Sequence, residues 1–139
     1  MQHNVIALLK ELRAYALVKG IQAAIFYHEE ESYLMRFANS AISLNTNEHL
    51  VRLQISVYAG NKRADYLIIA DPAQIEPMKR AIDTAAEMAS LAEPLSYTPT
   101  VPVYDEDVID MRAFDPFLAG TTNAERLEFF NTLARGLET

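Results

Sequence analysis

Residues 32–46, SYLMRFANSAISLNT, decide how we interpret the fold of this chain. Apolar residues occupy every second position on both sides of a central Asn39-Ser40 pair: Tyr33, Met35, Phe37, Ile42 and Leu44. A period of two is typical of a strand with one buried face. Asparagine accepts a positive φ more readily than most residues, which suits a tight turn between antiparallel strands. We therefore predict a β-hairpin with Asn39 at its tip.

Length, composition and charge set the class of protein. The 139 residues are enough for one domain, and half of them are hydrophobic, as in ordinary globular proteins. The formal net charge is −7 and the Lys and Arg residues are scattered, so the sequence lacks the basic stripe of nucleic-acid binders and favours repulsion from anionic membranes. The chain contains no cysteine, and it shows neither a signal peptide nor a transmembrane run. We expect a cytoplasmic protein without direct contact to nucleic acid or membrane.

The segments around the hairpin complete a meander. An amphipathic helix is expected from Val5 to about Ala16, with Gly20 as its stop, followed by a strand over residues 21–28. The run Glu29-Glu30-Glu31 predicts a solvated turn, because three like charges would repel inside a sheet. Alternation predicts two more strands, over residues 50–58 and 63–70. The expected fold is two-layer α+β: an antiparallel meander of four to five strands with helices packed on one face.

The C-terminal half predicts a helix, a connection and a second helix. Asp71-Pro72 resembles a helix start, but Pro77 disfavours a helix interior. Either a separate turn comes first and the main helix starts near Pro77, or the helix is kinked there, and we favour the separate turn. Residues 93–121 are rich in proline and acidic residues, and a capping box at residues 122–125 starts the last helix. The predicted organisation is a core domain over residues 1–92, a surface connection over 93–121, and a helix over 122–139 that packs on the domain or leads out of it.

No catalytic or metal-binding pattern emerges from the sequence. His28-Glu29 lacks the second histidine of a zinc helix, and His49 beside Glu48 is better explained as a loop pair. The acidic residues between 105 and 110 lack the glycine and spacing of an EF-hand loop. The sequence contains no G-x-S-x-G and no phosphate-binding loop. We therefore assign no catalytic residue, no metal ligand and no cofactor to this chain.

Four residues are candidates for binding a peptide or a partner protein. Arg36 lies between Met35 and Phe37 and should face away from the core, either in solvent, paired with a cross-strand acid, or as a charged anchor. A free sheet edge could also add an extended peptide as another strand. The face of residues 50–58 opposite Val51 and Leu53 meets water or a partner. The candidates are Arg36 and Asn39 on the hairpin, and Arg52 and Gln54 on the alternating strand.

The order of these elements resembles the N-terminal domain of the TldD/PmbA family. That family, also called modulators of DNA gyrase, comprises zinc metallopeptidases and their partner subunits. Its R-F-x-N-G-x-I pattern matches at Arg36, Phe37, Asn39 and Ile42, with Ser40 in place of the glycine. Residues 57–60 resemble its strand and turn, and Phe114-Asp115-Pro116 resembles its Tyr-Asp-Pro segment. The resemblance extends over nearly the whole chain, although its motifs are short and mostly structural.

The resemblance implies a non-catalytic domain that contributes to dimer assembly and to a peptide-binding cleft. In the family, an H-E-x-x-x-H helix and a cysteine in a later region bind zinc, and neither is present here. Zinc is therefore expected only in a full-length family protein, and whether this chain takes part in an enzyme stays open. The expected partners are a protein or peptide, including a homodimeric or heterodimeric family subunit. The alternative is a stand-alone acidic chaperone or adaptor that binds a protein partner.

Overall fold

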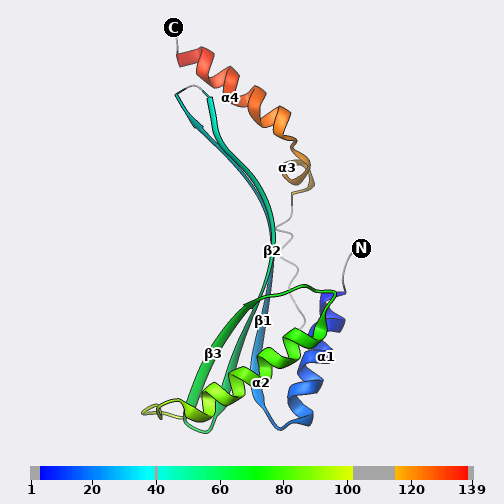
Figure 1. The fold of residues 1–139 in the computed structure, drawn as a ribbon, viewed down its shortest axis with the longest axis vertical. Coiled ribbons are helices and arrows are strands. Elements are labelled where there is room, and N and C mark those ends of the chain that lie inside the picture. The colour runs from blue at the N-terminus through cyan, green and yellow to red at the C-terminus, as the bar shows by residue number, and fades with distance from the viewer. Residues whose placement is uncertain (1–3, 40, 102–114, 138–139) are drawn as a thin grey trace. The chain divides into compact units, whose positions relative to one another are not determined.

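The chain folds as an α+β protein in which helices pack against a three-stranded antiparallel meander sheet (Figure 1). The computed structural model describes residues 4–39, 41–101 and 115–137. The strand order in the sheet is the order in the chain, β1-β2-β3. The elements are α1 (Val5–Val18), β1 (Gln22–Ala38), β2 (Ala41–Ala59), β3 (Lys62–Ile69), α2 (Ile75–Leu91), α3 (Pro116–Gly120) and α4 (Asn123–Leu137).

The chain divides into two compact units that share the two longest strands. The first unit contains Met1–Glu31 and Glu48–Val103, and therefore α1, β3, α2 and the adjoining parts of β1 and β2. The second unit contains Ser32–Asn47 and Tyr104–Thr139, and therefore the hairpin tip, α3 and α4.

The core of the first unit lies between one sheet face and the helices α1 and α2. Alternate residues of β2 point into it, and Leu53 and Ile55 are completely buried. From α2, Met78 and Ile82 are equally inaccessible, and α1 contributes Leu12. Small alanines of α2 at the same interface allow the helix to approach the strands closely. Burial of these side chains supplies most of the stability of the unit.

The hairpin of residues 32–46 is confirmed, but its strands are much longer than expected. Asn39 has a positive φ of 51° between β1 and β2, as predicted for the tip, and Ser40 lies outside the described residues. The predicted strands over residues 21–28 and 33–37 are one strand of 17 residues, β1. The partner strand β2 is continuous over 19 residues. The sheet therefore has three strands, and the expectation of four to five was wrong.

The predicted turn at Glu29–Glu31 was also wrong, because these residues lie inside β1, where Glu29 and Glu30 find partners on β1 and β2. Glu29 accepts a hydrogen bond from Tyr27 and lies 2.8 Å from the ring nitrogen of His49 on β2. Glu30, on the other face, accepts a hydrogen bond from Arg52 at 2.9 Å. Alternation thus separates the three charges onto two faces, and neighbouring groups offset their repulsion. The strand continues where charge alone predicted a break.

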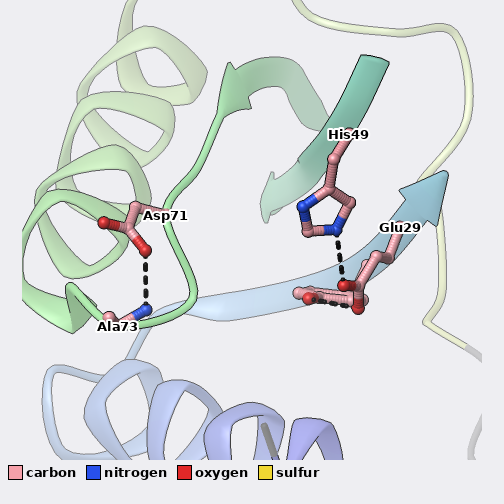
Figure 2. Close-up of polar contacts among 5 residues, drawn as sticks. Glu29, His49, Asp71 and Ala73 are labelled. Atoms are coloured by element: carbon pink, nitrogen blue, oxygen red, sulfur yellow. Dashed lines mark hydrogen bonds and ion pairs between the residues drawn. The ribbon is translucent and has the colours of Figure 1, made fainter. Parts of the chain in front are cut away.

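The start of α2 confirms the predicted separate turn. Asp71 accepts hydrogen bonds from the backbone N–H of Ala73 and from the side chain of Gln74, so it caps the turn and not the helix (Figure 2). The helix then begins at Ile75, and Gln74 provides no side-chain cap. Pro77 falls in the first turn, where its missing N–H leaves no helical hydrogen bond unmade.

The second unit joins the hairpin tip to the C-terminal helices. Asp115 caps α3 through the N–H groups of Phe117 and Leu118. Thr122 and Glu125 form the predicted capping box ahead of α4, with reciprocal hydrogen bonds of 2.7 and 3.3 Å. The ring of Phe37 stacks on Phe130 of α4, with centroids 3.6 Å apart and planes within 5°. Phe37 was predicted to point inward, and its ring in fact packs against α4.

Several predictions fall on residues that the structure does not describe. These are the acidic residues between 105 and 110, Phe114 of the Tyr-Asp-Pro-like segment, and the last two residues of the chain. The division into a core domain over residues 1–92, a connection over 93–121 and a terminal helix stays a prediction.

Candidate functional site

Among the described residues of the first unit, α1 and α2 cover one face of the sheet and no element covers the other, which we call the open face. On β2 and β3 this face consists of register pairs whose side chains lie on the same side of the sheet. Core residues such as Leu53 and Ile55 alternate with them and point toward the helices. The open-face pairs are Arg52 with Ile69, Gln54 with Leu67, Ser56 with Asp65, and Tyr58 with Arg63. β1 adds Ala24 and Phe26, which alternate with the core-facing Ala23, Ile25 and Tyr27.

Large apolar side chains are exposed on this open face. Phe26 is 63% exposed, Leu67 54% and Ile69 62%. Beside Phe26 lies a shallow groove of about 460 Å³ lined by Ala24, Ile25, Phe26, Gln54 and Ser56. Single exposed apolar residues are ordinary, but several on one face next to a groove are typical of an interaction surface.

Two ion pairs border the apolar residues. Arg63 lies 2.8 Å from Asp65, which also accepts a hydrogen bond from the hydroxyl of Ser56. Burial raises the pKa of the Asp65 carboxyl, but the hydrogen bonds from Arg63 and Ser56 outweigh it and leave the pKa below its ordinary value. Arg52 and Glu30 form the second pair, at 2.9 Å. Within these two pairs the charges of the arginines and the carboxylates cancel, on a chain whose net charge is −7.

The structure places two of the four predicted binding residues on this open face. Arg52 is half-buried and paired with Glu30, so it positions a charge at the rim. Gln54 is exposed and lines the groove. Both lie where the alternation of residues 50–58 predicted.

The other two predicted binding residues belong to the second unit. Arg36 is exposed near the hairpin tip and forms no ion pair with the residues that the structure describes. Asn39 is exposed at the tip itself, where its positive φ serves the turn. In the same unit, the guanidinium of Arg126 lies 4.6 Å from the centroid of the Tyr33 ring. Arg36 and Asn39 thus do not share a unit with Arg52 and Gln54.

A polar cluster on the sheet joins β1 to β2. His49 lies in β2, so the expected loop pairing with Glu48 was wrong. Its ring points at the carboxylate of Glu29 (Figure 2), and the two groups are 2.8 Å apart. Tyr27 donates a hydrogen bond to the same carboxylate at 3.0 Å. Burial, together with the bond to Glu29, raises the pKa of the Tyr27 hydroxyl to about 12, so it remains a donor at neutral pH. The cluster stabilises the strand pair at the run of glutamates.

The described residues contain neither a cluster of metal ligands nor a membrane-spanning helix. Among them, no three His, Cys, Asp or Glu side chains lie close enough together to hold a metal ion. None of the described helices has the length and hydrophobicity needed to cross a bilayer.

Sequence reasoning missed the apolar half of the open face. The signal was available in β1, where AAIFY places apolar residues on both faces of one strand. A strand that is apolar on both sides is covered on both sides, or is exposed for a partner.

Searches against protein families, characterised proteins and solved structures found no match for the chain.

Proposed function

We propose that this chain is a non-catalytic protein-binding module of a TldD/PmbA-like peptidase, which contributes to dimer assembly and to the binding of an extended peptide. The observation that carries the proposal is the open sheet face, with Phe26, Leu67 and Ile69 exposed around a groove. An apolar centre with a charge-balanced rim is the usual anatomy of a protein interface. Zinc and the residues that bind it would come from another region of such a peptidase.

Two features of the hairpin support the kinship. Asn39, which matches the asparagine of the family pattern, adopts the positive φ that a tight turn requires. Phe37 of the same pattern stacks on Phe130 of α4, which gives a structural reason for an aromatic residue there. These observations bear on structure alone, and the activity is inferred from the resemblance.

A binding experiment with matched variants tests the proposal. The purified chain is titrated with the zinc-binding region of a TldD/PmbA-like peptidase, and association is measured by calorimetry. Ile69→Asp places a charge in the open face, whereas Leu91→Asp places the same charge on a still more exposed apolar residue of α2. We expect Ile69→Asp to weaken association by about tenfold or more and Leu91→Asp to leave it unchanged. No association of the unmodified chain, or equal loss in both variants, would overturn the proposal.

The alternative function is a stand-alone acidic chaperone or adaptor. The second unit favours it, because Phe117, Leu118 and Phe129 on α3 and α4 are all largely exposed. Suppression of aggregation of an unfolded client by the chain alone, lost in Phe117→Asp and Phe129→Asp, would support this function over the peptidase module.

A further inference from the structure

As far as the described residues go, the edge of β1 in the first unit is a pairing surface that no other strand uses. β1 is the outer strand of the β1-β2-β3 sheet. Residues 22–28 make no backbone hydrogen bond to another element on their outer side within the part of the chain that the structure describes. An edge strand presents a row of N–H and C=O groups that another strand can complete.

The two edges of this sheet are protected very differently. β3 carries Lys62, Arg63 and Asp65, and charges of this kind discourage strand addition. Residues 22–28 of β1 read QAAIFYH, with no lysine, arginine, carboxylate, proline or glycine. The edge of β1 therefore lacks the usual protection of an edge strand over seven residues.

The side chains of this segment complement a second copy of themselves. If two β1 strands pair antiparallel around Ile25, Ala24 of each copy lies opposite Phe26 of the other, and Ala23 opposite Tyr27. Each large ring thus meets a small alanine, on both faces of the strand pair. Gln22 lies opposite His28, where two polar side chains can hydrogen bond.

The groove on the open face gives the ring of the second copy a place to lie. It is lined by Ala24 and bordered by Gln54 and Ser56 of β2. Phe26 is 63% exposed in the single chain, so pairing would remove a large apolar surface from water.

Charge also favours this register over the alternatives. In this register the acidic run of residues 29–31 lies beyond Gln22, where β1 of the second copy begins, and therefore does not meet the other acidic run. Two chains of net charge −7 repel each other, so an interface that separates their acidic segments is favoured.

We propose that two copies of this chain associate through antiparallel pairing of their β1 edges around Ile25, which joins two three-stranded sheets into one sheet of six strands. The arrangement is a twofold, isologous interface. This proposal names the interface of the dimer that the proposed function includes. It rests on the proposed function only in expecting a dimer.

Sedimentation of the full chain tests whether the edge of β1 carries association. We expect the unmodified chain to form dimers in the micromolar range and Phe26→Lys to be monomeric. Leu91→Lys is the control, because it places the same charge on an exposed apolar residue at the end of α2, outside the sheet. Circular dichroism verifies that both variants fold. A monomeric unmodified chain, or equal effects of the two substitutions, overturns the proposal.

Cysteine cross-linking tests the register. The chain has no cysteine of its own, so Ala24→Cys and Phe26→Cys can be mixed as differently tagged single variants and oxidised gently. Directly opposed residues of an antiparallel pair are within reach of a disulfide, whereas residues offset by two positions are not. We expect the 24–26 cross-link to predominate, with none from Leu67→Cys. Predominant 24–24 or 26–26 cross-links, or none above the Leu67→Cys level, contradict the proposal.

The two proposals fail separately. A monomeric chain that still binds the zinc-binding region would overturn only the β1 interface. A β1-paired dimer that binds neither that region nor an extended peptide would overturn only the peptidase module.

Discussion

At the scale of single residues, Asn39 is the position where local conformation most constrains the choice of side chain. Its φ of 51° lies in the left-handed region, where a Cβ approaches the following carbonyl oxygen. Asparagine tolerates this conformation, and β-branched residues do not. The family-like pattern around Arg36 and Phe37 thus coincides with a backbone requirement at the tip.

Substitutions of Asn39 test whether the positive φ at this position limits the choice of side chain. We expect Asn39→Val to lower the free energy of opening of the hairpin tip by about 1–2 kcal/mol, since valine pays the full cost of the left-handed conformation. Asn39→Gly should leave it nearly unchanged. Hydrogen exchange of the amides of residues 33–37 and 41–46 measures both, and equal exchange in the two variants would contradict the prediction.

Asp83 is a second residue whose contacts make a measurable prediction. From α2 it accepts hydrogen bonds from Tyr15 at 2.8 Å and from Lys19 at 2.6 Å, both of which belong to α1 or its C-terminal cap. The bond from Lys19 lowers the pKa of the Asp83 carboxyl, with a smaller contribution from Tyr15, although burial opposes them. The ionised carboxylate therefore stabilises the packing of α1 on α2.

This lowered pKa makes the stability of the first unit fall in acid. Because the folded pKa lies below the ordinary value of 3.8, the contribution is complete above that value and is lost as the pH falls through the folded pKa. We expect Asp83→Asn to cost no more than about 1 kcal/mol at neutral pH, since the pair is solvent-exposed, and to flatten the acid limb of stability against pH. Urea unfolding at several pH values measures this. Glu93→Gln is the control, and an unchanged acid limb in Asp83→Asn would contradict the assignment.

At the scale of elements, the sequence predicted the types of structure better than their extents. Alternation in residues 50–58 and the capping box at Thr122 identified β2 and α4 because both signals are local. The run of glutamates misled, because the partners that neutralise Glu29 and Glu30 are His49 and Arg52, which lie about twenty residues further along the chain. Cross-strand pairing of this kind is invisible until the register is known.

For the same reason, only part of the candidate site could be predicted from the sequence. Arg52 and Gln54 follow from the alternation of one strand. Leu67 and Ile69 join them only through the pairing of β2 with β3, and the groove requires β1 as well. A surface assembled from three strands is a property of the sheet and not of any one segment.

The two faces of β2 should differ sharply in their response to truncation. Leu53 is completely buried between the sheet and the helices, so Leu53→Ala should lower the free energy of unfolding by about 2–5 kcal/mol. Gln54→Ala, one residue along and on the open face, should change it by less than about 0.5 kcal/mol. Urea unfolding measures both, and similar losses would show that the open face is covered in the isolated chain.

At the scale of the whole molecule, the two units differ in how much they bury. All side chains that are almost inaccessible among the described residues belong to the first unit. In the second unit, the stacked pair Phe37 and Phe130 is only partly buried. A two-stranded ribbon gains little stability on its own, so the hairpin tip of the second unit depends on its contact with α4.

Hydrogen exchange should therefore resolve two levels of protection. We expect the amides of residues 33–46 and 123–136 to exchange faster than those of residues 50–57 and 78–89, because less apolar surface opposes their opening. Phe130→Ala should accelerate exchange in residues 33–46 and leave residues 50–57 unchanged, with Phe129→Ala as the exposed control. Uniform protection, or an equal effect of the two substitutions, would contradict the division.

The interleaving of the two units along the chain has a consequence for synthesis on the ribosome. The tip is made early, yet the helix that carries Phe130 is translated some ninety residues after Phe37. The first unit has all its strands and helices once Leu91 has emerged, while the tip still waits for its aromatic partner. During that interval Phe37, Met35 and Ile42 are nascent apolar surface of the kind that ribosome-associated chaperones bind.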